Sequence, residues 1–219
     1  MKPRNKIINV NEAIALVKPG ARIMVGGFGQ KGYPEILIDT LAKSKINGLT
    51  IISNDLGSPG EGLGKLLTNK QIKGLVGNYY NWNPDVADAY NAGKIDVTLL
   101  PQGTFAEAIR AAGAGISAFY TPTGAGTELG KGKEMRVLNN CNCVLEYAIY
   151  ADVALIKAHK ADTLGNLVYY KTARNFNPAM ASAATLTIAQ VDEIVQPGEI
   201  DPENIITPHI FVDAICKKE

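Results

Sequence analysis

The sequence contains few of the residue types that mark a specialised protein. Its 219 residues include two histidines, three cysteines and one tryptophan, and 22 basic residues against 21 acidic ones leave a net charge of +1. This balance argues against a nucleic-acid partner, because such proteins carry a basic surface. No apolar run reaches the roughly 18 residues that a membrane-spanning helix needs. Residues 1–5 are polar rather than an apolar signal region, so we expect a cytoplasmic protein without a membrane contact.

The cysteines and histidines offer little for a metal or a disulfide. Cys141 and Cys143 form one C-x-C pair, and Cys216 lies far along the chain. An odd number of cysteines without a second pair makes a poor disulfide framework and a poor zinc site. His159 and His209 have no ligand spacing. We therefore expect three free thiols in a reducing compartment and no metal site, while the pattern leaves the roles of these thiols open.

What is present is the composition of an ordinary globular protein. Hydrophobic residues make up 46% and charged residues 20% of the chain. A chain of this length can bury roughly 70% of its unfolded surface, so it needs no metal or disulfide to hold a core. We find no internal repeat and no linker, and we expect a single domain over residues 1–219.

Strand and helix patterns alternate over the first 120 residues. The predicted strands cover 22–28, 49–53, 74–79, 96–100 and 117–121. The predicted helices between them cover 35–44, 64–69, 83–90 and 104–112. Repeated strand–helix units of this kind predict an α/β fold, a mostly parallel open sheet with helices on both faces.

The second half changes character. Strands at 134–138 and 144–149 flank Asn139-Asn140, which is typical of a hairpin turn. An apolar strand at 153–157 is expected to pair with a strand at 167–170. A helix at 177–184 and a last strand at 184–195 complete the prediction. We therefore expect antiparallel strands in this half.

Glycine and amide residues gather where predicted strands end. The clusters cover 26–34, 53–55, 101–104 and 121–127. Ligands bind outside the carboxyl ends of the strands in open parallel sheets, so we expect a site at this edge. The alternative is that these residues only form turns. Asn54 and Gln102 carry side-chain amides that can donate to a developing oxyanion, although both residue types also serve in turns and caps.

The segment Gly27-Phe-Gly-Gln-Lys-Gly32 matches G-x-G-x-x-G, the fingerprint of a dinucleotide site. Asp55 lies 23 residues after Gly32, where a ribose-binding acid is expected. However, the predicted helix begins only at Pro34, beyond the last glycine, whereas a pyrophosphate needs the helix N-terminus within the glycines. An NAD(P)-dependent Rossmann dehydrogenase therefore stays as an alternative. Glycine in this loop also permits positive φ and close approach of a ligand or a second chain.

Several segments in the same order resemble another family. Val25-Gly-Gly-Phe-Gly-Gln-Lys-Gly-Tyr-Pro34 is similar to the G-G-F-x-x-x-G-x-P signature of the family I coenzyme A transferases. Further agreement comes from segments 51–55, 62–65, 101–104, 118–124, 151–157 and 174–178, so the resemblance spans nearly the whole chain. Within this family, the sequence most resembles the alpha subunits of the CoA-transferases that exchange CoA between acetoacetate and either acetate or butyrate.

The resemblance implies ping-pong transfer of CoA between an acyl-CoA and a carboxylic acid, through a glutamyl-CoA thioester. CoA is then a substrate, and no cofactor is permanently bound. In the family the nucleophilic glutamate lies in an S-E-N-G motif of the beta subunit, and no such motif occurs here. Glu203-Asn204 is followed by Ile205, and Glu61 directly precedes Gly62. The resemblance thus implies a half-enzyme, active only with a beta subunit, and an α2β2 assembly is the default expectation.

Site residues follow from the same resemblance. Gln102 and Asn54 match amide positions near the reacting carboxyl group, as oxyanion donors or positioning groups. The residues expected to line the cleft for the partner, the acyl-pantetheine or the acid substrate are Gly26, Gly27, Phe28, Gly29 and Lys31. A third hypothesis is a non-catalytic binding or regulatory protein of the same fold.

Overall fold

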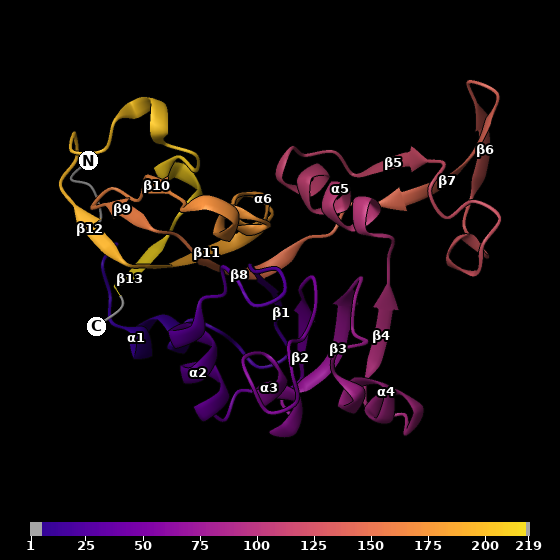
Figure 1. Ribbon diagram of the computed structural model, residues 1–219, viewed down its shortest axis with the longest axis horizontal. Helices are drawn as coiled ribbons and strands as arrows, with labels where there is room; N and C mark the ends of the chain where they lie inside the picture. The colour runs from indigo at the N-terminus through magenta and orange to yellow at the C-terminus, as the bar shows by residue number, and fades with distance from the viewer. Residues whose placement is uncertain (1–5, 218–219) are drawn as a thin grey trace.

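The computed structural model describes residues 6–217. Residues 1–5, from which we predicted the absence of a signal region, lie outside the described residues. Its centre is a seven-stranded sheet in the order β13-β11-β8-β1-β2-β3-β4, in which every neighbouring pair is parallel (Figure 1). The strands are β1 (Arg22–Val25), β2 (Leu49–Ile52), β3 (Ile72–Gly77), β4 (Asp96–Leu99), β8 (Ala151–Lys157), β11 (Ala184–Val191) and β13 (Ala214–Lys217). The predicted parallel sheet is confirmed.

Helices cover both faces of this sheet, as predicted. They are α1 (Val10–Ala15), α2 (Glu35–Lys43), α3 (Gly64–Thr68), α4 (Pro84–Asn91), α5 (Gln102–Gly113) and α6 (Asn177–Ser182). Ile23 and Val25 of β1 pack with residues of α1 to α4, whereas Met24 packs with residues of α5 and α6. Successive strand residues point to opposite faces, so one strand contributes to both cores. Both faces of the sheet are therefore apolar and covered.

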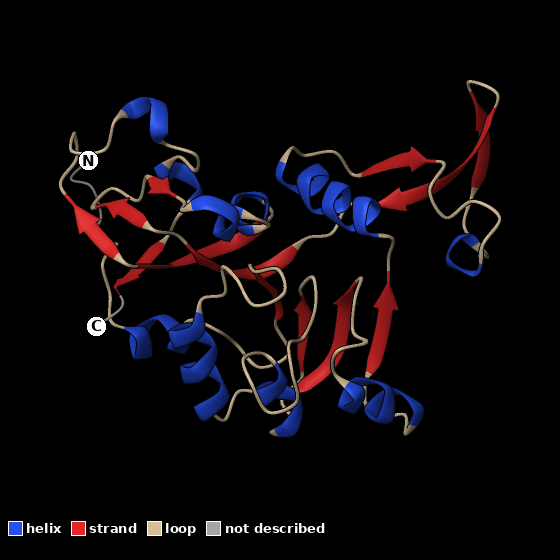
Figure 2. Cartoon of the chain, viewed as in Figure 1, coloured by secondary structure: helices blue, strands red, loops and turns tan. Residues whose placement is uncertain are grey.

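Two three-stranded sheets lie outside the main one (Figure 2). The first consists of β5 (Ala118–Thr121), β6 (Met135–Leu138) and β7 (Cys141–Tyr147), and it is antiparallel. The second consists of β9 (Lys160–Asp162), β10 (Leu167–Val168) and β12 (Glu193–Val195). Four short 3-10 helices complete the described chain: η1 (Glu128–Gly130), η2 (Lys171–Arg174), η3 (Pro202–Asn204) and η4 (His209–Phe211). The hairpin turn at Asn139-Asn140 is confirmed, since both residues have positive φ.

Three strand predictions are wrong in pairing or in extent. The strand at 153–157 belongs to β8, which pairs in parallel with β1 and β11, whereas the strand at 167–168 pairs with β9. β8 is an almost continuous apolar run, and such runs are typical of central strands that are buried on both faces. β5, predicted as the fifth strand of the parallel sheet, instead pairs antiparallel with β7. The predicted strand at 184–195 is interrupted at Asp192 and forms two strands, β11 and β12. Local patterns do not specify which of several strands is the partner.

Within residues 6–217, no helix combines the length and the apolar character needed to cross a membrane.

Candidate active site

The loops that follow β1, β2 and β3 and the start of α5 after β4 meet at the carboxyl edge of the sheet. They surround a cavity of about 280 Å³. Its lining residues are Phe28, Gly29, Asn54, Asp55, Asn78, Tyr79, Trp82 and Gln102. Three of the four predicted clusters therefore meet at one edge. The fourth, at 121–127, follows β5 in the separate antiparallel sheet and does not line this cavity.

The glycine-rich loop after β1 folds back on itself before α2 begins. Phe28 and Lys31 exchange two backbone hydrogen bonds, of 3.0 and 3.1 Å. Gly27 has a φ of +134°, and a Cβ at this position would lie 2.5 Å from the ring of Tyr33. A side chain is thus excluded there both by backbone conformation and by space. The loop is a tight turn that places Phe28 and Gly29 at the cavity.

Two asparagines, one just before α6 and one at its first position, fix this loop through hydrogen bonds. Asn175 accepts a hydrogen bond from the backbone N–H of Gly27 at 3.1 Å and donates to the carbonyl of Lys31 at 3.1 Å. Asn177 is fully buried and donates to the carbonyl of Gly32 at 3.0 Å. The loop is therefore fixed by residues that lie more than 140 positions away in the sequence.

Asp55 connects the first two loops. Its carboxylate accepts hydrogen bonds from the N–H of Gly29 (2.9 Å), the hydroxyl of Tyr33 (2.8 Å), the amide of Asn54 (2.9 Å) and the N–H of Gly57 (3.0 Å). Asp55 is 1% exposed. Burial and the neighbouring Asp55 carboxylate raise the pKa of the Tyr33 hydroxyl above its ordinary value of 10.0, so it stays a neutral donor. Four donors satisfy a buried negative charge that would otherwise be costly.

The side-chain amides of Gln102 and Asn54 differ in whether their N–H donors already have hydrogen-bond partners. Gln102, the first residue of α5, is exposed, and its Oε1 accepts a hydrogen bond from Nδ2 of Asn78. Its Nε2 forms no hydrogen bond with the described part of the chain and remains available as a donor at the cavity. Asn54 is 4% exposed, and its Nδ2 donates a hydrogen bond to the carboxylate of Asp55, while its Oδ1 has no hydrogen-bond partner within residues 6–217. Gln102 is thus the more accessible donor.

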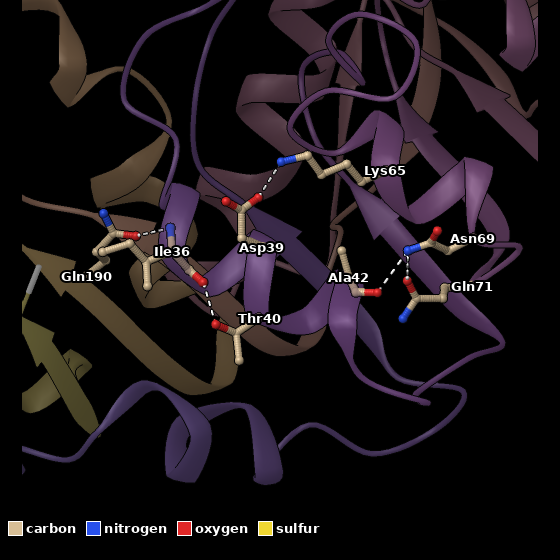
Figure 3. Close-up of polar contacts among 8 residues, drawn as sticks. All are labelled: Ile36, Asp39, Thr40, Ala42, Lys65, Asn69, Gln71 and Gln190. Carbon is tan, nitrogen blue, oxygen red and sulfur yellow. Dashed lines mark hydrogen bonds and ion pairs between the residues drawn. The ribbon is translucent and has the colours of Figure 1, made fainter. Parts of the chain in front are cut away.

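The start of α2 is closed to an external anion. Pro34 caps it without a side-chain hydrogen bond, and the N–H of Ile36 instead donates to Oε1 of Gln190 in β11 at 2.9 Å (Figure 3). At the other end of α2, Asn69 donates to the carbonyl of Ala42 at 2.8 Å (Figure 3). A dinucleotide site needs a free helix N-terminus for the pyrophosphate. That alternative is therefore not favoured, and the acid expected to bind the ribose, Asp55, is already engaged by four donors.

The structure brings Asn54, Gln102, Phe28 and Gly29 together at one cavity. The other predicted cleft residues do not line it: Gly26 and Gly27 are buried at the start of the loop, and Lys31 is exposed within the loop. The expectations did not include Asn78, Tyr79 and Trp82. The predicted strand at 74–79 included Asn78 and Tyr79, but β3 ends at Gly77, so both lie in the loop that follows it. The only sequence signal for Trp82 was its position shortly after that predicted strand.

The three cysteines lie away from this cavity, and all are free thiols. Cys216 is 2% exposed. Burial raises the pKa of its thiol to about 11, which makes it a poor nucleophile at neutral pH.

Comparison with known proteins identifies the family. The family model described as Coenzyme A transferase matches residues 7–218. The chain belongs to the coenzyme A transferase family. This coenzyme A transferase chain is 50% identical over 216 residues to one of the subunits of the succinyl-CoA:3-ketoacid coenzyme A transferase of Helicobacter pylori strain J99, covering 98% of this chain and 93% of that protein. It is 41% identical over 212 residues to the alpha subunit of the acetate CoA-transferase of Escherichia coli K12, covering 97% and 96%.

Solved structures share the fold of this coenzyme A transferase chain. An acyl-CoA transferase of Escherichia coli O157:H7, solved as a thioester complex with CoA, aligns with a TM-score of 0.85 at 21% identity, over 99% of this chain and 48% of that one. Glutaconate coenzyme A-transferase of Acidaminococcus fermentans aligns with a TM-score of 0.82 at 22% identity, over 97% and 75%. The resemblance drawn from the motifs, and the expectation of an enzyme that transfers CoA groups, are confirmed.

Proposed function

We propose that this chain is the alpha subunit of a heteromeric CoA-transferase. It moves CoA between a short-chain acyl-CoA (acetoacetyl-CoA, butyryl-CoA or acetyl-CoA) and a free carboxylic acid. The observation that carries the proposal is the free Nε2 donor of Gln102 at a cavity whose walls are largely apolar. Such a site suits a small acyl group with one polar end. The name of the Escherichia coli relative, an acetate CoA-transferase, agrees with this class of substrate.

A second observation supports a nucleophile from another chain. Among the described residues that line the cavity, Asp55 is the only acidic one. It is 1% exposed, and its two oxygens already accept four hydrogen bonds. Donors that stabilise the carboxylate anion lower its reactivity, and burial denies it an approach to a carbonyl carbon. We therefore place the nucleophilic glutamate on a beta subunit, which matches the absence of S-E-N-G from this sequence.

The proposed reaction is covalent ping-pong catalysis. The partner's glutamate attacks the thioester carbonyl carbon of the acyl-CoA, and the tetrahedral oxyanion collapses to an acyl–glutamyl anhydride with release of CoA thiolate. The thiolate attacks the glutamyl carbonyl, which gives an enzyme–CoA thioester and frees the first acid. A second carboxylate then enters, the steps run in reverse, and it leaves as its CoA ester. The thioester energy is conserved throughout, so the chemistry needs no metal, no ATP and no bound cofactor beyond CoA as substrate.

In this scheme Gln102 stabilises the oxyanion with its Nε2 donor. Gln102 is also the first residue of α5, and the positive end of a helix favours negative charge that develops nearby. Asn54 is a positioning residue, since one hydrogen of its Nδ2 is committed to Asp55. Phe28 and Gly29 contact the substrate or the partner, Gly26 and Gly27 set the shape of the loop, and Lys31 attracts the carboxylate from outside.

We also propose that the functional unit is a cytoplasmic α2β2 assembly in which residues 1–219 form a single domain. Two-fold symmetry is the commonest arrangement of soluble oligomers, and a site shared between two chains requires each to be present.

The first experiment compares the purified chain with the complex that it forms with a co-expressed beta subunit. CoA exchange between acetoacetyl-CoA and acetate is followed by the loss of the acetoacetyl-CoA absorbance. We expect no exchange from the single chain and robust exchange from the complex. Robust exchange from the single chain would overturn the half-enzyme proposal.

A substitution separates the enzyme from a binding protein of the same fold. In the assembled complex Gln102→Ala should lower kcat about a hundred- to a thousandfold, because one oxyanion donor typically contributes roughly 2.7 to 4 kcal/mol. Gln196→Ala, which removes another exposed glutamine outside the cavity, is the matched control and should leave kcat unchanged. An unchanged kcat in Gln102→Ala would favour the non-catalytic hypothesis.

A further inference from the structure

A second cavity lies beside the first. It has a volume of about 370 Å³ and lies between the glycine-rich loop, α2 and the loop before α3. Gly29 and Trp82 line both cavities. These two residues therefore form the wall between the space next to Gln102 and the space over α2.

The side chain of Trp82 supplies nearly all of this wall, because Gly29 has none. The indole packs edge-on against the ring of Tyr79, with a centroid distance of 5.5 Å and an interplanar angle of 90°. It also covers Gly29, since a Cβ at Gly29 would lie 3.7 Å from the indole ring. Trp82 is nevertheless 56% exposed, so it is held by these surface contacts and not by the core. Shortening this side chain opens the wall without creating a hole in the core.

The second cavity combines apolar surface with negative charge. Ile38 and Leu63 contribute apolar side chains, and Glu35 and Glu61 contribute carboxylates. The lysine among its lining residues, Lys65, is occupied, because Nζ binds the carboxylate of Asp39 at 2.7 Å (Figure 3). Three carboxylates and one ammonium give this cavity a formal charge of −2. A neutral alkyl chain can enter such a space, whereas a second carboxylate or a phosphate is repelled.

We propose that Trp82 determines the length of acyl chain that this enzyme accepts. The inference rests on the proposed function, in which the acyl carbonyl lies at Gln102. With the reacting end there, the rest of the acyl group occupies the 280 Å³ cavity, which Trp82 also lines. The indole of Trp82 blocks the passage from this cavity into the second one and so limits the acyl group to short chains. Behind it lies space that suits the alkyl tail of a longer monocarboxylate and repels the terminal carboxylate of a dicarboxylate.

The test is Trp82→Ala in the assembled complex, with acetate, butyrate, hexanoate and adipate as acceptors. One methylene in an apolar pocket changes discrimination by roughly 10- to 200-fold. We therefore expect the ratio of kcat/KM for hexanoate to that for acetate to rise at least tenfold. Adipate has the same six-carbon backbone with a second carboxylate, and it should gain less than threefold. Trp82→Leu keeps an apolar side chain of intermediate size and should give an intermediate ratio.

Tyr90→Ala is the matched control, since Tyr90 is an aromatic residue that is 55% exposed on α4 and lines neither cavity. It should leave the chain-length profile unchanged. An unchanged hexanoate-to-acetate ratio in both Trp82 variants, with wild-type turnover of acetate, would overturn this inference alone. An equal gain for adipate and hexanoate would overturn the assigned charge selectivity. Absence of CoA transfer by the wild-type complex would instead overturn the proposed function.

Discussion

Replacement of Asp55 by asparagine tests how the candidate site is held together. The two oxygens of Asp55 serve different pairs of donors. Oδ1 accepts from Tyr33 and from the N–H of Gly57, and Oδ2 accepts from the N–H of Gly29 and the amide of Asn54. An asparagine offers one oxygen and one NH2 group. In either orientation of the new amide, the NH2 group faces a backbone N–H, that of Gly57 or that of Gly29.

The magnitude follows from this geometry. The hydroxyl of Tyr33 and the amide of Asn54 can reorient to accept a hydrogen bond, but a backbone N–H cannot. At least one N–H therefore loses its acceptor, which costs about 1–3 kcal/mol. The bonds that remain lose the carboxylate charge, and charged hydrogen bonds contribute about 1 kcal/mol more than neutral ones. We expect Asp55→Asn to lower the free energy of unfolding by about 2–5 kcal/mol.

The assay is urea unfolding of the purified chain, with the midpoint converted through the m-value. Asp88→Asn, on the exposed side of α4, is the control and should stay within about 0.5 kcal/mol of the wild type. In the complex, Asp55→Asn should also lower kcat, because Gly29 and Asn54 are displaced at the cavity. A destabilisation below about 1 kcal/mol with an unchanged kcat would refute the role given to this carboxylate.

Three further predictions concern other parts of the molecule. Because the pKa of Tyr33 is raised in the folded chain, the neutral phenol stabilises the fold fully below about pH 10. Above about pH 10 the unfolded phenol releases its proton first, and this contribution is lost. Tm should therefore fall between about pH 10 and about pH 11.5, and Tyr33→Phe should flatten that decline. Gln190→Leu leaves the N–H of Ile36 without its acceptor and should cost about 1–3 kcal/mol in urea unfolding, whereas a loss under about 0.5 kcal/mol would contradict its capping role. With a thiol reagent at about pH 8, exposed Cys141 should react fast in the native chain and buried Cys216 only after denaturation; rapid reaction of Cys216 would contradict its burial.

Much of the first half of the fold follows from local pattern. The four strand–helix units from β1 to α5 lie where hydrophobic periodicity and the glycine and proline signals predicted them. Each strand here pairs with the next one along the chain, so a prediction of consecutive parallel strands describes the sheet correctly. The glycine-rich loop, Asn54 and Gln102 could therefore be assigned to one edge from the sequence alone.

The sequence by itself also determined the class of enzyme, because its motifs occur in one order along nearly the whole chain. Only the tertiary structure decided how the site is held. Asn175, which directly follows η2, contacts the glycine-rich loop from 148 residues away, and Gln190 of β11 contacts α2 from 154 residues away. Trp82 separates two cavities only because the loop after β3 folds against Gly29. Such contacts join distant segments through shape and hydrogen bonding, and no local pattern specifies which segments will meet.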